Sequence, residues 1–247
     1  MIEREIRIQT LDGESDGWLY QPEKTGSWPG VIFLTDIGGI RRAQQESARR
    51  ICALGYSVLL PNIFYRVGKP PLMTYPLKLE DPKTQQRFAE LKNSLPPAAV
   101  DLDSSAYVDF LASQAGVREG KFGVVGYCFS GAFAMRMAAA RPEKIAAVAA
   151  FHAGGLYTDA SDSPHAILPR LKARLYFGHA VEDRSMTKEA IEKFESALAA
   201  WGGKFESETY AGANHSWTTL DSPVYNHAQA ERAFEKLTAL FAAALRG

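Results

Sequence analysis

The chain has 247 residues, and its 28 lysines and arginines balance its 28 aspartates and glutamates. Without a net field, recruitment of nucleic acid or of an anionic membrane surface is not expected. The start, MIEREIRIQT, is charged and alternating, unlike a signal peptide, and no apolar run approaches ~18 residues. Two cysteines, Cys52 and Cys128, make no disulfide framework. We therefore expect a cytoplasmic protein, whose oligomeric state the sequence leaves open.

The first third of the chain has the pattern of strands followed by a strand–helix–strand unit. Residues 3–9 alternate apolar and charged side chains, and the Asp12-Gly13 turn leads to a second half-exposed strand. Two continuous apolar runs are typical of strands covered on both faces. A glycine-containing loop and a helix connect these runs. The expected elements are strands at 3–9, 17–21, 31–34 and 56–60, with a loop at 35–41 and a helix reaching about residue 54.

The rest of the chain alternates helices with strands, after an irregular segment. Residues 67–97 are rich in Pro, Lys and Met, and we interpret them as a surface excursion near the site, with one helical patch. Ser222 followed by Pro223 is a well-matched helix start, so we expect Ser222 to cap the last helix. The expected helices are at 85–95, 99–115, 187–201 and after 222, and the strands at 122–125, 145–151, 173–177 and 205–210.

Alternation of strands and helices predicts a mostly parallel central sheet with helices on both faces. The length suits a single α/β domain over 1–247. In such sheets, functional side chains gather at the carboxyl ends of the strands. We therefore expect catalytic residues in the loops that follow the predicted strands.

One stretch, KFGVVGYCFSGAFAMRMAAAR at 121–141, passes from an apolar strand through a sharp turn into a small-residue helix. Cys128 lies at the turn, with Gly126 before it and Ser130 and Gly131 after it. This G-x-C-x-S-G pattern is a nucleophile elbow with sulfur in place of oxygen, and the helix N-terminus behind it favours a thiolate. Ser130 is the rival nucleophile, but it lacks the flanking glycine. An inert buried thiol is the ordinary alternative for Cys128.

Two later strand ends supply an acid and a base. Asp183 lies in the sequence GHAVEDRSM, and His215 lies in YAGANHSWT. Nucleophile, acid and histidine in this chain order are typical of the α/β-hydrolase fold. Glu182 competes with Asp183 for the acid. Alternative bases, also near strand ends, are His152 and His179, either of which could instead line a pocket.

An oxyanion formed when Cys128 attacks a carbonyl needs two N–H donors. One is expected from the backbone of Phe129, directly after the nucleophile. The other is expected from Ile37, in the loop after the third strand. An ordinary flexible turn at Gly38-Gly39 is the competing interpretation of that loop.

With these residues assembled, the chain resembles the dienelactone hydrolase (carboxymethylenebutenolidase) family of α/β-hydrolases over nearly its whole length. The resemblance rests on the motifs TDIGGIR, LLPNIFYR, GYCFSG, GHAVEDRSM and YAGANHSWT, in that order. It implies that Cys128, Asp183 and His215 form the triad. It also implies that Asp36 is the acid that contacts the nucleophile and governs thiol ionisation, and that Arg66 grips a substrate carboxylate.

Three positions depart from the family pattern, and the last of them bears on the substrate. Ser130 stands where glycine is usual, and Asp36 where the longer Glu is common. Thr219 stands where the dienelactone enzymes carry a second arginine. Together with Tyr65 and Trp217, the long 67–97 segment predicts a more aromatic, differently shaped substrate pocket, which His152 could also line.

The sequence therefore predicts a cofactor-free hydrolase of lactones or small carboxylic esters that works through a Cys-His-Asp triad and a thiol ester intermediate. No group of His, Cys and Asp has the spacing of metal ligands. A non-catalytic ligand-binding or sensor protein on the same scaffold is the alternative. A redox role for Cys128 is a second alternative, which would need Cys52 as a resolving thiol.

Overall fold

The computed structural model describes residues 1–75, 77–78 and 80–246. The chain divides into two compact units, an N-terminal unit (Met1–Glu119) and a C-terminal unit (Gly120–Gly247). The expectation of a single domain over 1–247 stays a prediction.

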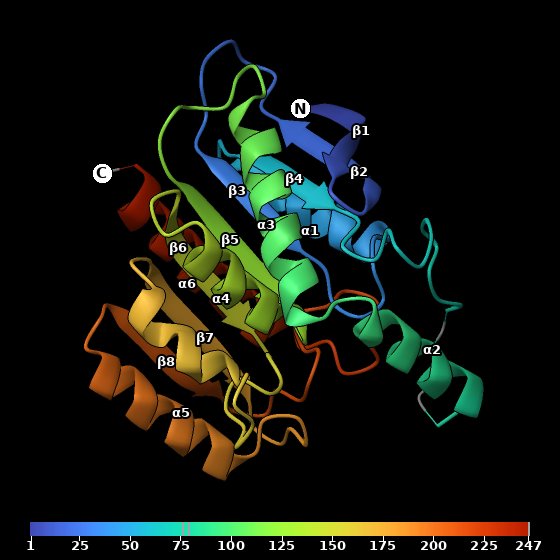
Figure 1. Ribbon diagram of the computed structural model, residues 1–247, viewed down its shortest axis with the longest axis vertical. Coiled ribbons are helices and arrows are strands. Elements are labelled where there is room, and N and C mark those ends of the chain that lie inside the picture. The colour runs from blue at the N-terminus through green and yellow to red at the C-terminus, as the bar shows by residue number, and fades with distance from the viewer. Residues whose placement is uncertain (76, 79, 247) are drawn as a thin grey trace. The chain divides into compact units, whose positions relative to one another are not determined.

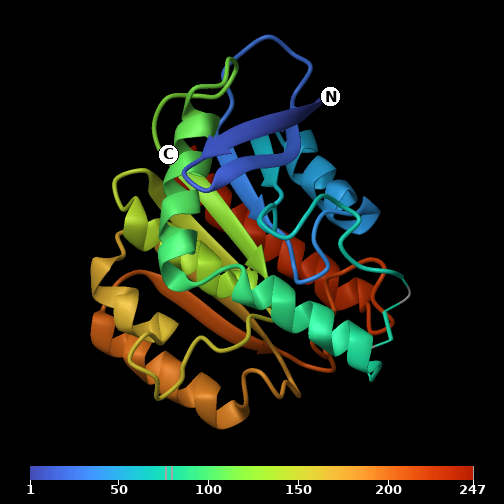
Figure 2. The same cartoon turned by 45° about the vertical axis from the view of Figure 1, so that its right-hand side comes forward.

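The N-terminal unit begins with an antiparallel hairpin that extends a parallel pair of strands. β1 pairs with β2 from Ile2↔Gln21 to Thr10↔Gly13, and β2 pairs antiparallel with β4. β3 and β4, both fully buried, run parallel. Helices α1 and α3 lie on opposite faces of the β3–β4 pair (Figures 1 and 2). The elements are β1 (Ile2–Thr10), β2 (Gly13–Gln21), β3 (Gly30–Leu34), α1 (Arg42–Ala53), β4 (Ser57–Pro61), α2 (Pro82–Asn93) and α3 (Pro97–Ala112).

The C-terminal unit is a four-stranded parallel sheet in the order β5-β6-β7-β8. Helices α4 and α5 lie on one face of this sheet, and α6 lies on the other (Figure 1). Each connection crosses from the end of one strand to the start of the next, which is why the strands are parallel. The elements are β5 (Phe122–Tyr127), α4 (Ser130–Ala140), β6 (Ile145–Phe151), the 3₁₀ helix η1 (Pro164–Arg170), β7 (Arg174–Ala180), α5 (Lys188–Trp201), β8 (Phe205–Tyr210) and α6 (His227–Leu245).

The predicted elements are present, with shifted ends. The strand expected at 173–177 continues to Ala180, so His179 lies inside β7. The prediction that Ser222 caps the last helix is wrong. The side chain of Ser222 instead accepts a hydrogen bond from the N–H of Val224 in a local turn. α6 begins at His227, and Asn226 caps it by accepting from the N–H of Gln229.

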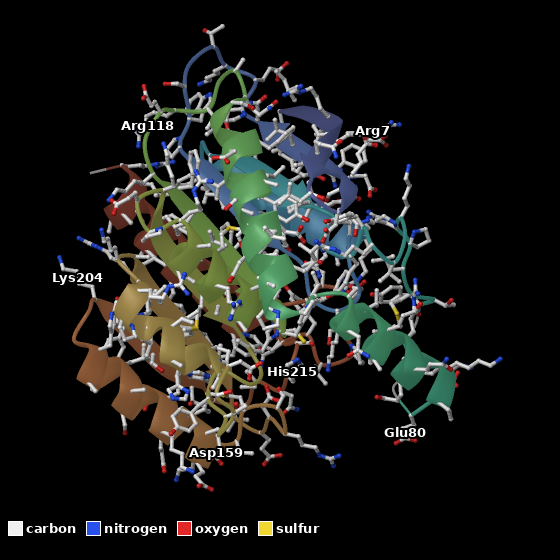
Figure 3. The ribbon with its side chains drawn as sticks, in the orientation of Figure 1. Arg7, Glu80, Arg118, Asp159, Lys204 and His215 are labelled. Carbon is white, nitrogen blue, oxygen red and sulfur yellow. The ribbon has the colours of Figure 1, made fainter. Side chains whose placement is uncertain are left out.

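Parallel strands place their carboxyl ends at one edge of the C-terminal unit. Cys128 follows β5, and His152 follows β6. Asp183 and His215 lie in the loops after β7 and β8. Figure 3 shows His215 at the edge toward which the strands point, and Lys204, just before β8, at the opposite edge. The fold therefore gathers these four side chains.

Candidate active site

The turn at Cys128 has the geometry that the sequence pattern predicts. Cys128 has a φ of 57°, in the left-handed region that a residue with a side chain rarely adopts. A Cβ on Gly126 would lie 2.4 Å from the carbonyl oxygen of Ser130, and one on Gly131 would lie 2.4 Å from the Cβ of Ala153. A larger residue at Gly126 would force β5 and α4 apart, and one at Gly131 would force α4 away from the loop after β6. Cys128 itself is half-buried.

Ser130 closes the turn with its side chain. Its Oγ accepts a hydrogen bond from the N–H of Tyr127 and donates one to the carbonyl oxygen of Tyr127, both at 2.9 Å. The residue is 0% exposed. A hydroxyl held in this way on the strand side of the turn is a structural group, and this disfavours Ser130 as the nucleophile.

His215 connects Cys128 to Asp183. Its Nε2 lies 3.1 Å from Sγ of Cys128, and its Nδ1 lies 2.5 Å from Oδ2 of Asp183. The other carboxylate oxygen of Asp183 accepts from the N–H and the hydroxyl of Ser185, at 2.8 and 2.6 Å. Asp183 is therefore fixed from both sides, and it fixes the ring of His215. Ser185 was missed in the sequence, although a serine two residues after an aspartate is a common signal of such a turn.

The charged forms of His215 and Asp183 stabilise each other. Burial lowers the pKa of His215, but its hydrogen bonds to Asp183 and Cys128 and their charges outweigh burial and raise that pKa to about 10. Burial also acts to raise the pKa of Asp183, but the hydrogen bond and the charge of His215 outweigh it, and the pKa is lowered. At neutral pH, His215 is therefore an imidazolium next to the Asp183 carboxylate.

His152 lies behind the backbone of Cys128 rather than beside its sulfur. The N–H of Cys128 points to Nδ1 of His152 at 3.2 Å, and Nε2 of His152 lies 2.8 Å from Oγ1 of Thr218. The ring packs edge-on against the rings of His215 and Trp217, with centroids 5.1 Å apart in each case. His152 is only 1% exposed. This position disfavours His152 as the base, and its role in lining a substrate pocket stays a prediction.

The other sequence alternatives lie outside this array. Glu182 is exposed, whereas Asp183 faces His215. His179 is buried in β7 and contacts the hydroxyl of Ser207 at 3.1 Å. Trp217 is fully buried and packs on Tyr210, so its contacts are with the protein. Its role in a substrate pocket stays a prediction.

Asp36, in the N-terminal unit, is held by its own loop. Both carboxylate oxygens are paired with the guanidinium of Arg41, at 2.7 and 2.9 Å. Gln44 donates to Oδ2 at 2.8 Å, and the N–H of Gly38 donates to Oδ1 at 2.9 Å. These contacts shape the loop that carries Ile37. The roles of Asp36 and Ile37 toward Cys128 stay predictions.

Arg66, also in the N-terminal unit, lies between two carboxylates. It forms a two-pronged pair with Asp103, at 2.7 and 2.9 Å, and it contacts Asp12 through Nε and Nη2. The ring of Tyr65 lies under the guanidinium, with its centroid 4.5 Å from Cζ of Arg66. The hydroxyl of Tyr65 donates a hydrogen bond to Asp103. Asp103 is 0% exposed, so Arg66 neutralises a buried charge. Neither partner is evident from the sequence, because Asp103 lies in a helix 37 residues away.

The two cysteines differ in their surroundings. Cys52 is buried in α1 of the N-terminal unit, and burial raises the pKa of its thiol to about 11. A thiol of this kind is almost entirely protonated at neutral pH, which disfavours it as a resolving thiol.

The described part of the chain contains no group of three or more His, Cys, Asp or Glu side chains that could hold a metal ion. Among its helices, none combines the length and the apolar character needed to cross a bilayer. The cellular location and the absence of a cofactor stay predictions.

The fold and the order of Cys128, Asp183 and His215 in the chain define an α/β-hydrolase. A crystal structure of a Klebsiella pneumoniae protein provisionally named dienelactone hydrolase superposes with a TM-score of 0.86 at 23% identity, covering 98% of each chain. The sequence model of the dienelactone hydrolase family matches residues 15–245. The chain belongs to this family and is a hydrolase of the class that acts on lactones and carboxylic esters.

Curated relatives are similar over most of their length. A protein of Methylorubrum extorquens, provisionally named carboxymethylenebutenolidase, is 25% identical over 241 residues, which are 96% of this chain and 79% of the relative. The carboxymethylenebutenolidase of Rhodococcus opacus is 26% identical over 209 residues, covering 81% of this chain and 74% of the relative. The predicted family and fold class are thus confirmed.

Proposed function

We propose that this protein hydrolyses a lactone or a small carboxylic ester with Cys128 as nucleophile, His215 as proton carrier and Asp183 as the acid that orients His215. One observation carries the proposal: a single imidazole contacts both the thiol sulfur, at 3.1 Å, and a carboxylate oxygen, at 2.5 Å. A nucleophile paired with a base that a third group orients is the general signature of covalent catalysis.

In the first half-reaction, the Cys128 thiolate attacks the carbonyl carbon, and a C–S bond forms. The carbonyl oxygen becomes an oxyanion, and we propose that the N–H of Phe129, the residue before α4, stabilises it. The tetrahedral intermediate then collapses, the C–O bond to the leaving oxygen breaks, and His215 gives its Nε2 proton to that oxygen. An acyl thioester on Cys128 and an alcohol result. In a lactone the alcohol remains attached to the acyl group.

In the second half-reaction, the now neutral His215 removes a proton from a water molecule. The hydroxide adds to the thioester carbonyl, the C–S bond breaks, and the carboxylic acid leaves. The thiolate and the imidazolium are restored, so the sum of the two halves is ester plus water to acid plus alcohol. Asp183 stabilises the imidazolium at both stages without taking its proton.

Cys128→Ala tests this proposal, with Cys52→Ala as the matched control. We expect Cys128→Ala to lower kcat/KM for p-nitrophenyl acetate by at least about 10³-fold. Cys52→Ala should leave it unchanged, because Cys52 is buried in the other unit. Mass spectrometry after rapid acid quenching should find an acyl group on Cys128 alone. Turnover that survives in Cys128→Ala would remove the enzyme mechanism, and absence of turnover in the wild type would favour the non-catalytic sensor.

The partners of Arg66 bear on the substrate class. Its guanidinium already faces Asp12 and Asp103 within the N-terminal unit. A cation that two carboxylates neutralise is a poor anchor for a third. Thr219, where the family's second arginine is expected, is uncharged and 6% exposed. We therefore propose that turnover does not require an anionic substrate, and that neutral aryl esters and lactones are accepted.

A further inference from the structure

The ring of His152 links the nucleophile's backbone to the loop that carries His215. The N–H of Cys128 is shared between two acceptors, the carbonyl oxygen of Phe151 at 3.1 Å and Nδ1 of His152 at 3.2 Å. At the other end of the ring, Nε2 of His152 lies 2.8 Å from Oγ1 of Thr218. Thr218 is three residues after His215 in the chain. Cys128 and His215 are therefore joined twice, directly through Sγ and indirectly through the ring of His152.

The direction of the two hydrogen bonds fixes the protonation of the ring. An amide N–H can only donate, so Nδ1 must accept with a lone pair and carries no proton. The one proton of the neutral ring is then on Nε2 and is donated to the hydroxyl oxygen of Thr218. Burial and the neighbouring positive charge of His215 both lower the pKa of His152, which keeps the ring neutral. Neither nitrogen has a free lone pair with which to deprotonate Cys128.

We propose that His152 is a positioning residue, which holds the Cys128 backbone and the Thr218 hydroxyl at a fixed separation so that Sγ stays within hydrogen-bond distance of Nε2 of His215. This inference rests on the proposed function. The positions involved are conformationally costly, since His152 has a φ of 41° and Cys128 a φ of 57°. A ring anchored at both ends opposes relaxation of either residue. Displacement of a reacting group by about 1 Å is enough to cost 10²-fold in rate.

Two substitutions separate the two ends of this link. His152→Asn keeps an acceptor near the position of Nδ1, tolerates the left-handed backbone and loses the contact with Thr218. Thr218→Val keeps the volume of Thr218 and removes the hydroxyl that Nε2 contacts. Thr218→Ser restores the hydroxyl. His227→Asn, at an exposed site at the start of α6, is the matched control for a histidine substitution.

We expect His152→Asn and Thr218→Val each to lower kcat by about 10- to 100-fold, with KM changed less than about threefold. Thr218→Ser should restore kcat. The double variant His152→Asn/Thr218→Val should have a kcat no lower than that of either single variant, because both substitutions break the same contact between His152 and Thr218. In a Cys52→Ala background, alkylation of Cys128 by iodoacetamide should slow in parallel. Thr218→Val keeps the test available if His152→Asn does not fold.

A raised KM at unchanged kcat would make His152 a substrate contact and overturn the proposal. Loss of kcat with unchanged alkylation of Cys128 would also overturn it, since the sulfur and the imidazole would then still be paired. Failure here is distinct from failure of the proposed function. If Cys128→Ala is inactive while the His152 and Thr218 variants are fully active, the nucleophile stands and the positioning role falls.

Discussion

Nε2 of His215 lies 3.1 Å from Sγ of Cys128 while Nδ1 of the same ring faces the carboxylate of Asp183. The imidazolium is thus placed between two groups that are negative when ionised, and its pKa is raised to about 10. Because the hydrogen bond and the charge of Cys128 contribute to this shift, the pKa of His215 reports on the charge of the sulfur it contacts.

We expect an NMR titration of the His215 ring to have its midpoint near pH 10 in the wild type. In Cys128→Ala, the hydrogen bond and the charge on sulfur are lost while the burial that opposes protonation stays. The midpoint should therefore fall by more than about one pH unit. Cys128→Ser, which keeps a hydrogen-bond partner without the charge, should fall in between. An unchanged midpoint in Cys128→Ala would mean that the sulfur carries no charge next to His215.

Ser130→Ala separates a structural hydroxyl from a nucleophile. The substitution removes the two hydrogen bonds that Oγ of Ser130 makes with the buried N–H and C=O of Tyr127. We expect a loss of about 1–3 kcal/mol in the free energy of unfolding, measured by urea denaturation, and kcat within about tenfold of the wild type. Loss of turnover at unchanged stability would instead identify Ser130 as the reacting residue.

Arg66→Ala should destabilise the protein rather than change its preference for charged substrates. The buried carboxylate of Asp103 would lose its two-pronged partner, at a cost of about 3–5 kcal/mol in the free energy of unfolding. The paired substitution Arg66→Met/Asp103→Leu should cost less, because no uncompensated charge remains. kcat/KM should change equally for neutral and carboxylate-bearing esters. A loss confined to the carboxylate-bearing esters would restore the substrate-anchor role.

His179 makes stability depend on pH. Burial lowers its pKa to about 4, with Asp183 opposing only partly, whereas an unfolded histidine titrates near 6.5. The unfolded chain therefore takes up this proton first as the pH falls. The contribution of neutral His179 to the free energy of unfolding is complete above pH 6.5 and is lost progressively toward pH 4. Its size is on the order of 3 kcal/mol.

His179→Gln should reduce the loss of unfolding free energy between pH 7 and pH 4.5, measured by urea denaturation at both values. His227→Gln, at an exposed position, is the control and should leave the pH dependence of the wild type intact. If both variants lose stability as the wild type does, other groups carry the acid sensitivity.

Much of the site could be predicted because it depends on local pattern and chain order. The glycines around Cys128 are required by backbone approach at the turn, and parallel strands bring the loops of Asp183 and His215 to the same edge. These properties can be read from spacing alone. The three side chains then meet because β5, β7 and β8 belong to one parallel sheet and end at the same edge of it.

The contacts that the sequence did not predict depend on partners distant along the chain. The pairing of Arg66 with Asp103 and of His152 with Thr218 joins residues 37 and 66 positions apart. A motif shows that such a residue is present, but not what it faces. The wrong prediction for the start of α6 has a local cause. The side chain of Ser222 accepts from the N–H of Val224 in a turn, whereas that of Asn226 accepts from the N–H of Gln229 and caps the helix.

The left-handed residues other than glycine, in the part of the chain that is described, are Cys128, His152 and Ser216. One is the proposed nucleophile, one is the residue proposed to position it, and one directly follows His215. Selection for heat tolerance alone would favour Gly or Asn at each of these positions, since both relax the backbone there. Variants recovered from such a selection should be more heat-stable and should turn over substrate more slowly. The candidate active site is thus also where the thermal stability of this enzyme is most easily raised.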